Sequence, residues 1–237
     1  MARPDVLTNA TNLVNSRDPT TLDARRANDT LAILTNQDVT LNVPRPDSTS
    51  LRVSIYADCC GSTLSPIHKR QLGYLVFLTD ASHHFSLQHC ASHRPPRGCR
   101  GSTAGELLAL VDAISASLDE LHLLQKLPSV RIPLYAYTDS ATAYELVTSF
   151  KYSVDMSRKN DLYMLRCALP SGTMHELKHV HGQDNPADAL SKPSFARPPP
   201  NASLADALRT GRLDTAIEAH TTTDGQRKKP RPGVTLC

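Results

Sequence analysis

The stretch Leu51-Arg-Val-Ser-Ile-Tyr-Ala-Asp58 is a short, mostly apolar run that ends on an aspartate, and it decides the fold. Arg131-Ile-Pro-Leu-Tyr-Ala-Tyr-Thr-Asp139 repeats this pattern much later in the chain. Runs of this kind predict buried strands, and two neighbouring parallel strands would bring both carboxylates to one edge of a sheet. In open α/β sheets, ligands bind at that carboxyl-terminal edge. The two runs therefore predict an α/β domain with an acidic site.

The rest of the central chain alternates between strand and helix patterns. Further strands are expected over 71–79, 85–91 and 174–180. Helices are expected over 103–125, 140–149 and 158–168, and from Asn185 onward; the first has its apolar stripe at Leu107, Leu110, Val111, Ile114, Leu118 and Leu121. Three strands joined by short turns, followed by alternating helices and strands, predict a five-stranded mixed sheet with three antiparallel strands and then two parallel ones, flanked by helices.

The 237 residues are enough for one domain with additional segments at both ends. Residues 51–193 form the predicted domain. Residues 1–50 are polar and are interpreted as a linker or connection segment, with a helix expected over 20–34 and a short strand near 39–43. Residues 194–237 are expected to form a Pro-rich, basic and largely disordered tail, with one helix at 203–219.

The composition of the chain argues against a membrane-spanning, secreted or disulfide-bonded protein. No run approaches the roughly 18 apolar residues that span a bilayer, and the N-terminus lacks the apolar segment of a signal peptide, so we expect an intracellular protein without a membrane partner. The six cysteines show no C-x-x-C spacing, which makes free thiols the expectation. A net charge of +3 permits a polyanionic partner without requiring one.

Two more acids, Glu106 and Asp188, are expected near the same edge, but every acid also has a structural explanation. Glu106 and Thr103 have the spacing of a capping box. Asp139 is placed to cap a helix, and Asp188 lies near a predicted helix start, where the helix dipole favours an acid. Asp58 could simply begin a turn.

Taken together, the four acids favour a metal site. Four carboxylates on one rim repel one another and need a cation, and helix N-termini help to keep them ionised, as metal ligands must be. Oxygen ligands favour Mg²⁺ or Mn²⁺ over Zn²⁺. Such a site can hold two ions about 4 Å apart, one activating water and one stabilising the leaving oxygen of a phosphodiester.

Four motifs, in order across the central block, resemble those of a ribonuclease H domain from the polyprotein of an LTR retrotransposon of the copia type. They are Ile55-Tyr-Ala-Asp58, Ser102-Thr-Ala-Gly-Glu-Leu-Leu-Ala-Leu110, Tyr137-Thr-Asp-Ser140 and His179-Val-His-Gly-Gln-Asp-Asn-Pro-Ala-Asp-Ala-Leu-Ser-Lys192. Upstream, Arg3-Pro-Asp5 and Asn15-Ser-Arg-Asp-Pro-Thr20 resemble the segment that links reverse transcriptase to ribonuclease H in such elements.

This resemblance implies a ribonuclease H-like fold and a two-metal-ion endonuclease that hydrolyses the RNA strand of RNA–DNA hybrids. Its four catalytic, metal-binding carboxylates would be Asp58, Glu106, Asp139 and Asp188, with Mg²⁺ or Mn²⁺ as cofactor. The implied partners are the hybrid and the reverse transcriptase domain of the same polyprotein, in the cytoplasm, a virus-like particle or the nucleus.

The chain also departs from the family pattern. Copia-type domains usually have Asp-Ala-Asp-Trp after the first strand, whereas this chain has Asp58-Cys-Cys-Gly61 and no tryptophan at all. The mobile histidine of the cellular enzymes has no clear counterpart. His181 lies in a shorter loop, where it could assist product release or simply be solvated.

Hybrid recognition depends on contacts to phosphates and to 2′-hydroxyl groups. Basic and hydroxyl side chains near the expected site are candidates for these contacts, and the alternative is that they are solvated surface groups. The candidates are Arg97, Arg100, Ser102, Thr103, Ser140, Arg158 and Lys159.

The stretch 83–99 is rich in histidine and cysteine, which raises the possibility of a zinc site. Its spacings match no finger or knuckle, and His89 and Cys90 would point to opposite faces of a strand. We therefore expect no zinc there.

Two competing functions stay open. One is a catalytically inactive nucleic-acid-binding domain of the same fold from a decayed element, although such a domain has no physical reason to keep four repelling carboxylates together. The other is a different metal nuclease on this sheet, such as an exonuclease or an integrase-like enzyme, whose acids are placed differently.

Overall fold

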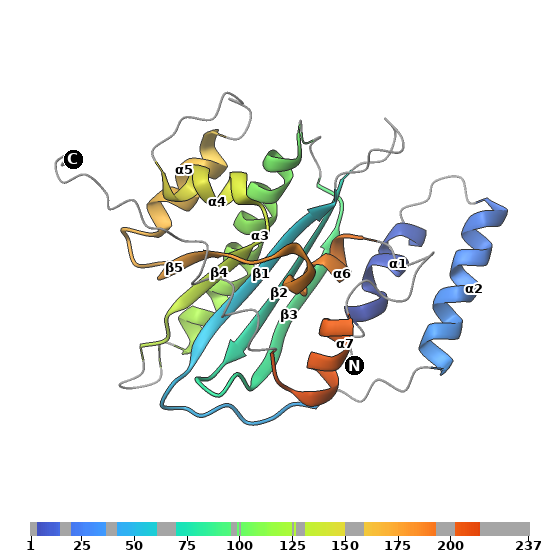
Figure 1. Ribbon diagram of the computed structural model, residues 1–237, viewed down its shortest axis with the longest axis horizontal. Coiled ribbons are helices and arrows are strands. Elements are labelled where there is room, and N and C mark those ends of the chain that lie inside the picture. Colours follow the sequence, from blue (N-terminus) through green and yellow to red (C-terminus); the bar gives the residue numbers. More distant parts are fainter. Residues whose placement is uncertain are drawn as a thin grey trace.

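The computed structural model describes residues 4–14, 20–36, 42–60, 70–95, 99, 101–124, 126, 131–149, 159–192 and 202–213. Its centre is a five-stranded sheet with the order β3-β2-β1-β4-β5 (Figure 1). The strands are β1 (Arg52–Cys60), β2 (Gln71–Thr79), β3 (Phe85–His93), β4 (Leu134–Thr138) and β5 (Glu176–His179). Pairing is antiparallel between β1, β2 and β3, and parallel from β1 to β4 and from β4 to β5. The predicted mixed sheet is confirmed.

Helices α2 to α5 begin and end close to the expected positions, whereas α6 begins later and α7 ends earlier than expected. The described ones are α1 (Pro4–Val14), α2 (Thr21–Asn36), α3 (Ser102–Leu124), α4 (Ala141–Thr148), α5 (Lys159–Ala168), α6 (Asp188–Ser191) and α7 (Ala202–Thr210), with a 3₁₀ turn, η2, at Gly182–Asp184. Helix α1 was not expected. Of the strand expected near 39–43, residues 39–41 lie outside the described part, and Asn42 and Val43 are not in a strand.

The sheet separates two apolar cores because side chains alternate between its faces. One face packs against α3, α4 and α5 and carries Val53, Ile55 and Ala57 of β1. The opposite face packs against α6 and α7 (Figure 1) and carries Tyr56 of the same strand. By the same alternation, the Asp58 side chain lies on the α6 face.

Segments outside the predicted domain also contribute to this second core. Leu204, Ala207 and Leu208 of α7 are buried in it, so the helix expected at 203–219 is present but ends at Thr210. Helix α1 contacts β3 and α6, with the Thr8 hydroxyl donating to the carbonyl of Ala189. The domain boundaries at residues 50 and 193 stay predictions.

The described residues include no helix with both the length and the apolar character needed to cross a membrane.

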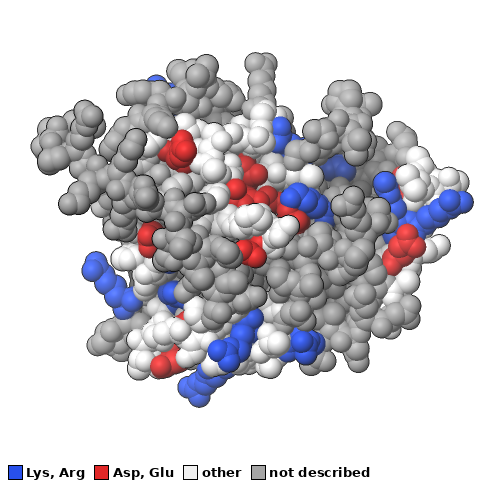
Figure 2. Space-filling model, viewed as in Figure 1, with Lys and Arg blue, Asp and Glu red and all other residues white. Residues whose placement is uncertain are grey.

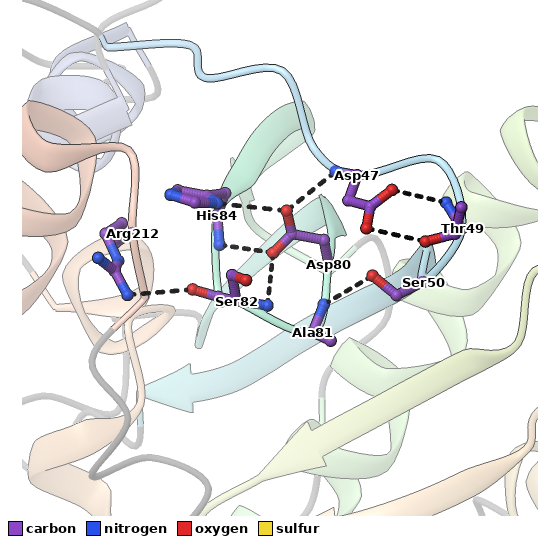
Figure 3. A network of polar contacts seen from close by, with 8 residues as sticks. All are labelled: Asp47, Thr49, Ser50, Asp80, Ala81, Ser82, His84 and Arg212. Carbon is purple, nitrogen blue, oxygen red and sulfur yellow. Dashed lines mark hydrogen bonds and ion pairs between the residues drawn. The ribbon is translucent and has the colours of Figure 1, made fainter.

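At the end of the sheet opposite the Asp58 edge, Asp80 joins the β2–β3 turn to the segment before β1 (Figure 3). Its carboxylate, which is 1% exposed, accepts hydrogen bonds from the backbone N–H groups of Asp47 (3.0 Å), Ser82 (2.8 Å) and His84 (3.0 Å). Burial raises the pKa of Asp80, but these bonds and the one from the His84 ring outweigh it, and the pKa lies below its ordinary value of 3.8.

Replacing Asp80 with asparagine should therefore lower the free energy of unfolding by about 2–3 kcal/mol at pH 7, because an amide NH₂ would face backbone donors. The folded-state pKa is depressed, so the stabilisation is complete above the unfolded-state value and is lost as pH falls below about 4. Urea unfolding of both proteins at pH 7 and pH 3 measures this. A difference that is as large at pH 3 as at pH 7 would contradict the role of the ionised carboxylate.

Candidate metal centre

Asp58 and Asp139 lie side by side because their strands are parallel neighbours in register. Ala57 of β1 pairs with Thr138 of β4, and each aspartate is the next residue along the chain. This is the arrangement predicted from the two apolar runs. Figure 2 shows acidic side chains gathered near the middle of the face in view, with basic atoms beside them.

Asp188, the first residue of α6, completes a group of three carboxylates. One oxygen atom from each of Asp58, Asp139 and Asp188 lies within 4.8 Å of the others. Asp58 is 2% exposed and Asp188 is 7% exposed, whereas Asp139 is half-buried. Three acids that are far apart in sequence therefore converge on a single position.

Helix α6 can reach this position because Gly73 of β2 has no side chain. Gly73 pairs directly with Asp58. A Cβ atom on Gly73 would lie 2.6 Å from the carbonyl carbon and Cβ of Leu190 and 2.8 Å from the backbone nitrogen of Ser191. The glycine thus allows α6 to lie directly on the sheet beside Asp58.

Two buried polar side chains fix α6 and its preceding loop to the end of β1. The Asn185 amide donates to the carbonyl of Ala57 (3.0 Å) and accepts from the backbone N–H of Ala187 (3.1 Å). The Ser191 hydroxyl donates to the Asp58 carboxylate. Asn185 and Pro186 were expected to open the helix, but α6 begins only at Asp188, since Asn185 is engaged with β1.

Glu106 approaches the same acids from α3. It is 7% exposed and accepts a hydrogen bond from the backbone N–H of Cys59, while its Oε2 atom is buried without a hydrogen-bond partner. The neighbouring Gly105 makes this approach possible, because a Cβ there would collide with the Cys59 Sγ atom. Glu106 therefore faces the sheet, and Thr103 lies inside α3, which begins at Ser102.

The acids perturb one another. Burial first, and then the charges of Asp58 and Asp139, raise the pKa of Glu106 to about 9. Burial and the charge of Asp139 also raise the pKa of Asp58, and burial is the main cause that raises the pKa of Asp188. Desolvated carboxylates that repel one another favour protonation unless a cation neutralises them.

Without added metal, the free energy of unfolding should fall as pH rises from about 4.5 to about 9, because the folded state holds a proton on Glu106 that the unfolded state has lost. Urea unfolding in EDTA at pH 5, 7 and 9 measures this decline. The Glu106→Gln variant serves as the control, since it lacks the titrating group and should decline less. Equal pH dependence in the two proteins would contradict the raised pKa.

The donor set fits a hard divalent cation. Its members are carboxylate oxygens, and Asp139 Oδ1, like Glu106 Oε2, is buried without a hydrogen-bond partner. Mg²⁺ and Mn²⁺ prefer such ligands. Three of the four predicted carboxylates, those of Asp58, Asp139 and Asp188, therefore form a cluster that fits a divalent metal ion, and Glu106 lies beside them.

Comparison with known proteins finds similar solved structures but no similar family or curated protein. No protein-family model matches this sequence, and no curated protein is significantly similar to it. The solved structures that are similar to this chain include ribonuclease H proteins and foamy virus protease–reverse transcriptases. Ribonuclease H1 from Halobacterium salinarum is 19% identical, over 59% of this chain and 94% of that one, with a TM-score of 0.41.

Two further structures extend the comparison. LC11-RNase H1, isolated from compost and crystallised with an RNA/DNA hybrid, is 19% identical over 59% of this chain and 93% of that chain, with a TM-score of 0.44. The foamy virus ribonuclease H domain is 15% identical over 69% of this chain and 95% of that one, with a TM-score of 0.39. Likenesses with TM-scores this low carry no argument about this chain.

The predicted nucleic-acid contacts are placed only in part. Ser102 and Lys159 are exposed at the starts of α3 and α5, and Thr103 is half-buried. The Ser140 hydroxyl accepts from the backbone N–H of Ala143 (3.2 Å), so Ser140, rather than Asp139, is the N-cap of α4. Three candidates lie outside the described residues: Arg97, Arg100 and Arg158.

Two histidines near the site form hydrogen bonds with the backbone. The His179 ring donates to the carbonyl of Asp139 (3.1 Å), and the exposed His181 accepts from the backbone N–H of Gln183. His89 stacks on Tyr74, which belongs to the core on the α3 face of the sheet, whereas Cys90 packs in the core on the α6 face. The two residues therefore lie on opposite faces of the sheet, as expected.

Proposed function

We propose that this protein is a metal-dependent endonuclease that hydrolyses the RNA strand of RNA–DNA hybrids. The observation that carries the proposal is the convergence of Asp58, Asp139 and Asp188 from three separate elements, with Glu106 beside them. These are the acids of the four motifs that resemble ribonuclease H domains of LTR retroelements.

Each residue has a defined part in the proposed reaction. Asp58, Asp139, Asp188 and Glu106 would hold one or two divalent ions, which we propose to be Mg²⁺ or Mn²⁺. When bound, such ions lower the pKa of a coordinated water and neutralise charge on the leaving oxygen of a phosphodiester. Ser191 orients the Asp58 carboxylate by hydrogen bonding, so that it presents a fixed oxygen to the site.

We extend the proposal to the surroundings of the site. Contacts to the hybrid would come from Ser102, Thr103, Ser140 and Lys159, and from Arg97, Arg100 and Arg158. The resemblance supports a role in retroelement reverse transcription, next to a reverse transcriptase domain of the same polyprotein, inside the cell.

The test is incubation of the purified chain with end-labelled RNA in an RNA–DNA hybrid, an RNA duplex and a single strand. We expect cleavage of the hybrid alone, with Mg²⁺ or Mn²⁺, to products with 5′-phosphate and 3′-hydroxyl ends. Cleavage in excess EDTA would contradict the metal role. Binding of the hybrid without cleavage in Mg²⁺ or Mn²⁺ would support the inactive binding domain instead.

A further inference from the structure

Lys192 places a positive charge among the four carboxylates. It directly follows α6, and its backbone N–H donates to the carbonyl of Asp188 (3.1 Å). Its ammonium group reaches back one helical turn and forms an ion pair with Oδ1 of Asp188. Asp188 and Lys192 are four residues apart, the spacing that brings two side chains to the same face of a helix.

The charge of Lys192 also acts on the rest of the centre. It interacts electrostatically with Asp58, Asp139 and Glu106 as well as with Asp188. Lys192 therefore neutralises part of the repulsion among these acids, which is also what a bound divalent ion would do.

The side chain of Lys192 is able to withdraw. It is 46% exposed, whereas that of Asp188 is 11% exposed, so the ammonium enters the centre from the surface. A long, half-exposed lysine that loses one ion pair can return its charge to solvent at small cost. The Asp188 oxygen that it contacts is then available to another cation.

We propose that Lys192 is a built-in counter-ion of the carboxylate centre, which holds Asp188 until a divalent ion binds and competes with that ion for the carboxylate. This deepens the proposed function and rests on it. Lys192 is thus a positioning residue that sets how much divalent metal the protein needs.

The alternative is that Lys192 only stabilises the C-terminal end of α6 through the helix dipole. That role would change stability without changing metal affinity. Titration calorimetry with Mn²⁺, in the absence of nucleic acid, separates the two roles.

The Lys192→Met variant, which keeps an unbranched side chain only one atom shorter and removes its charge, should bind Mn²⁺ about tenfold more tightly than the unaltered protein. Lys126→Met is the matched control, because it removes one exposed positive charge beyond the far end of α3, roughly 25–30 Å from Glu106. This control should leave the Mn²⁺ affinity unchanged.

Mn²⁺ binding and hybrid cleavage together distinguish the role of Lys192 from the nuclease activity. Equal or weaker Mn²⁺ binding by Lys192→Met would overturn the counter-ion role, whether or not the protein cleaves hybrids. Tighter binding in a protein that cleaves no hybrid would support the role of Lys192 and overturn the proposed nuclease activity alone. If the unaltered protein binds no Mn²⁺, both proposals fail. Thermal unfolding of each variant in EDTA verifies that it is folded.

Discussion

Replacing Asp139 with asparagine should reduce cleavage of an RNA–DNA hybrid by about a thousandfold or more while the protein stays folded. The substitution replaces a charged oxygen ligand by a neutral amide of nearly the same size. Asp139 is half-buried at the end of β4, and its charge raises the pKa of Asp58. Removing that charge in the absence of metal should therefore leave the free energy of unfolding unchanged or raise it by up to about 1 kcal/mol.

The measurement pairs single-turnover cleavage with urea unfolding. Asp119→Asn is the control, because it makes the same chemical change at an exposed position on α3 and should affect neither quantity. Full activity of Asp139→Asn would refute its assignment to the metal centre. Loss of activity together with unfolding would show a structural role instead.

Replacing Gly73 with alanine should destabilise the protein by about 2–4 kcal/mol and reduce cleavage about ten- to a hundredfold. The new Cβ would overlap the backbone of α6 at Leu190 and Ser191, and a backbone clash is relieved only by moving the helix. That movement would displace Asp188 and withdraw Ser191 from Asp58, so stability and activity should fall together.

Gly172→Ala is the contrasting variant. Gly172 has a φ of +74° and no heavy atom within 4 Å of an added Cβ. Alanine there should cost about 1 kcal/mol from backbone strain and leave cleavage unchanged. If Gly73→Ala loses only about as much stability as Gly172→Ala and cleaves at the unaltered rate, close packing of α6 on the sheet does not position the metal centre.

The sheet and two of the acids, Asp58 and Asp139, follow from short-range patterns in the sequence. Apolar runs of strand length that stop on an aspartate specify both a strand and the edge on which its carboxylate lies, as β1 and β4 show. Helix α3 was predictable in the same way, because its apolar residues recur with the period of an α-helix.

Helix α1 was not predicted because its contacts are partly polar. Thr8 is 2% exposed and Thr11 donates to the carbonyl of Ser92, so hydroxyl groups occupy positions where a periodic pattern would show apolar residues. Helix α7 does carry an apolar stripe, but the Pro-rich sequence before it gave no sign that this stripe packs on the sheet.

The residues that position the acids could not be predicted either, because their roles exist only in the folded chain. Gly73 leaves room for α6, Asn185 donates a hydrogen bond to the carbonyl of Ala57, and Ser191 donates one to Asp58. Each contact joins residues far apart in sequence, and a single small or polar residue has no periodicity.

Anomalous scattering from a crystal soaked in Mn²⁺ tests the central claim most directly, because it locates the ion without reference to activity. We predict at least one strong peak coordinated by Asp58 and Asp139, within reach of Asp188 and Glu106. A soaked crystal with no peak among these carboxylates, or with its peak elsewhere on the protein, would contradict the assignment of the metal centre.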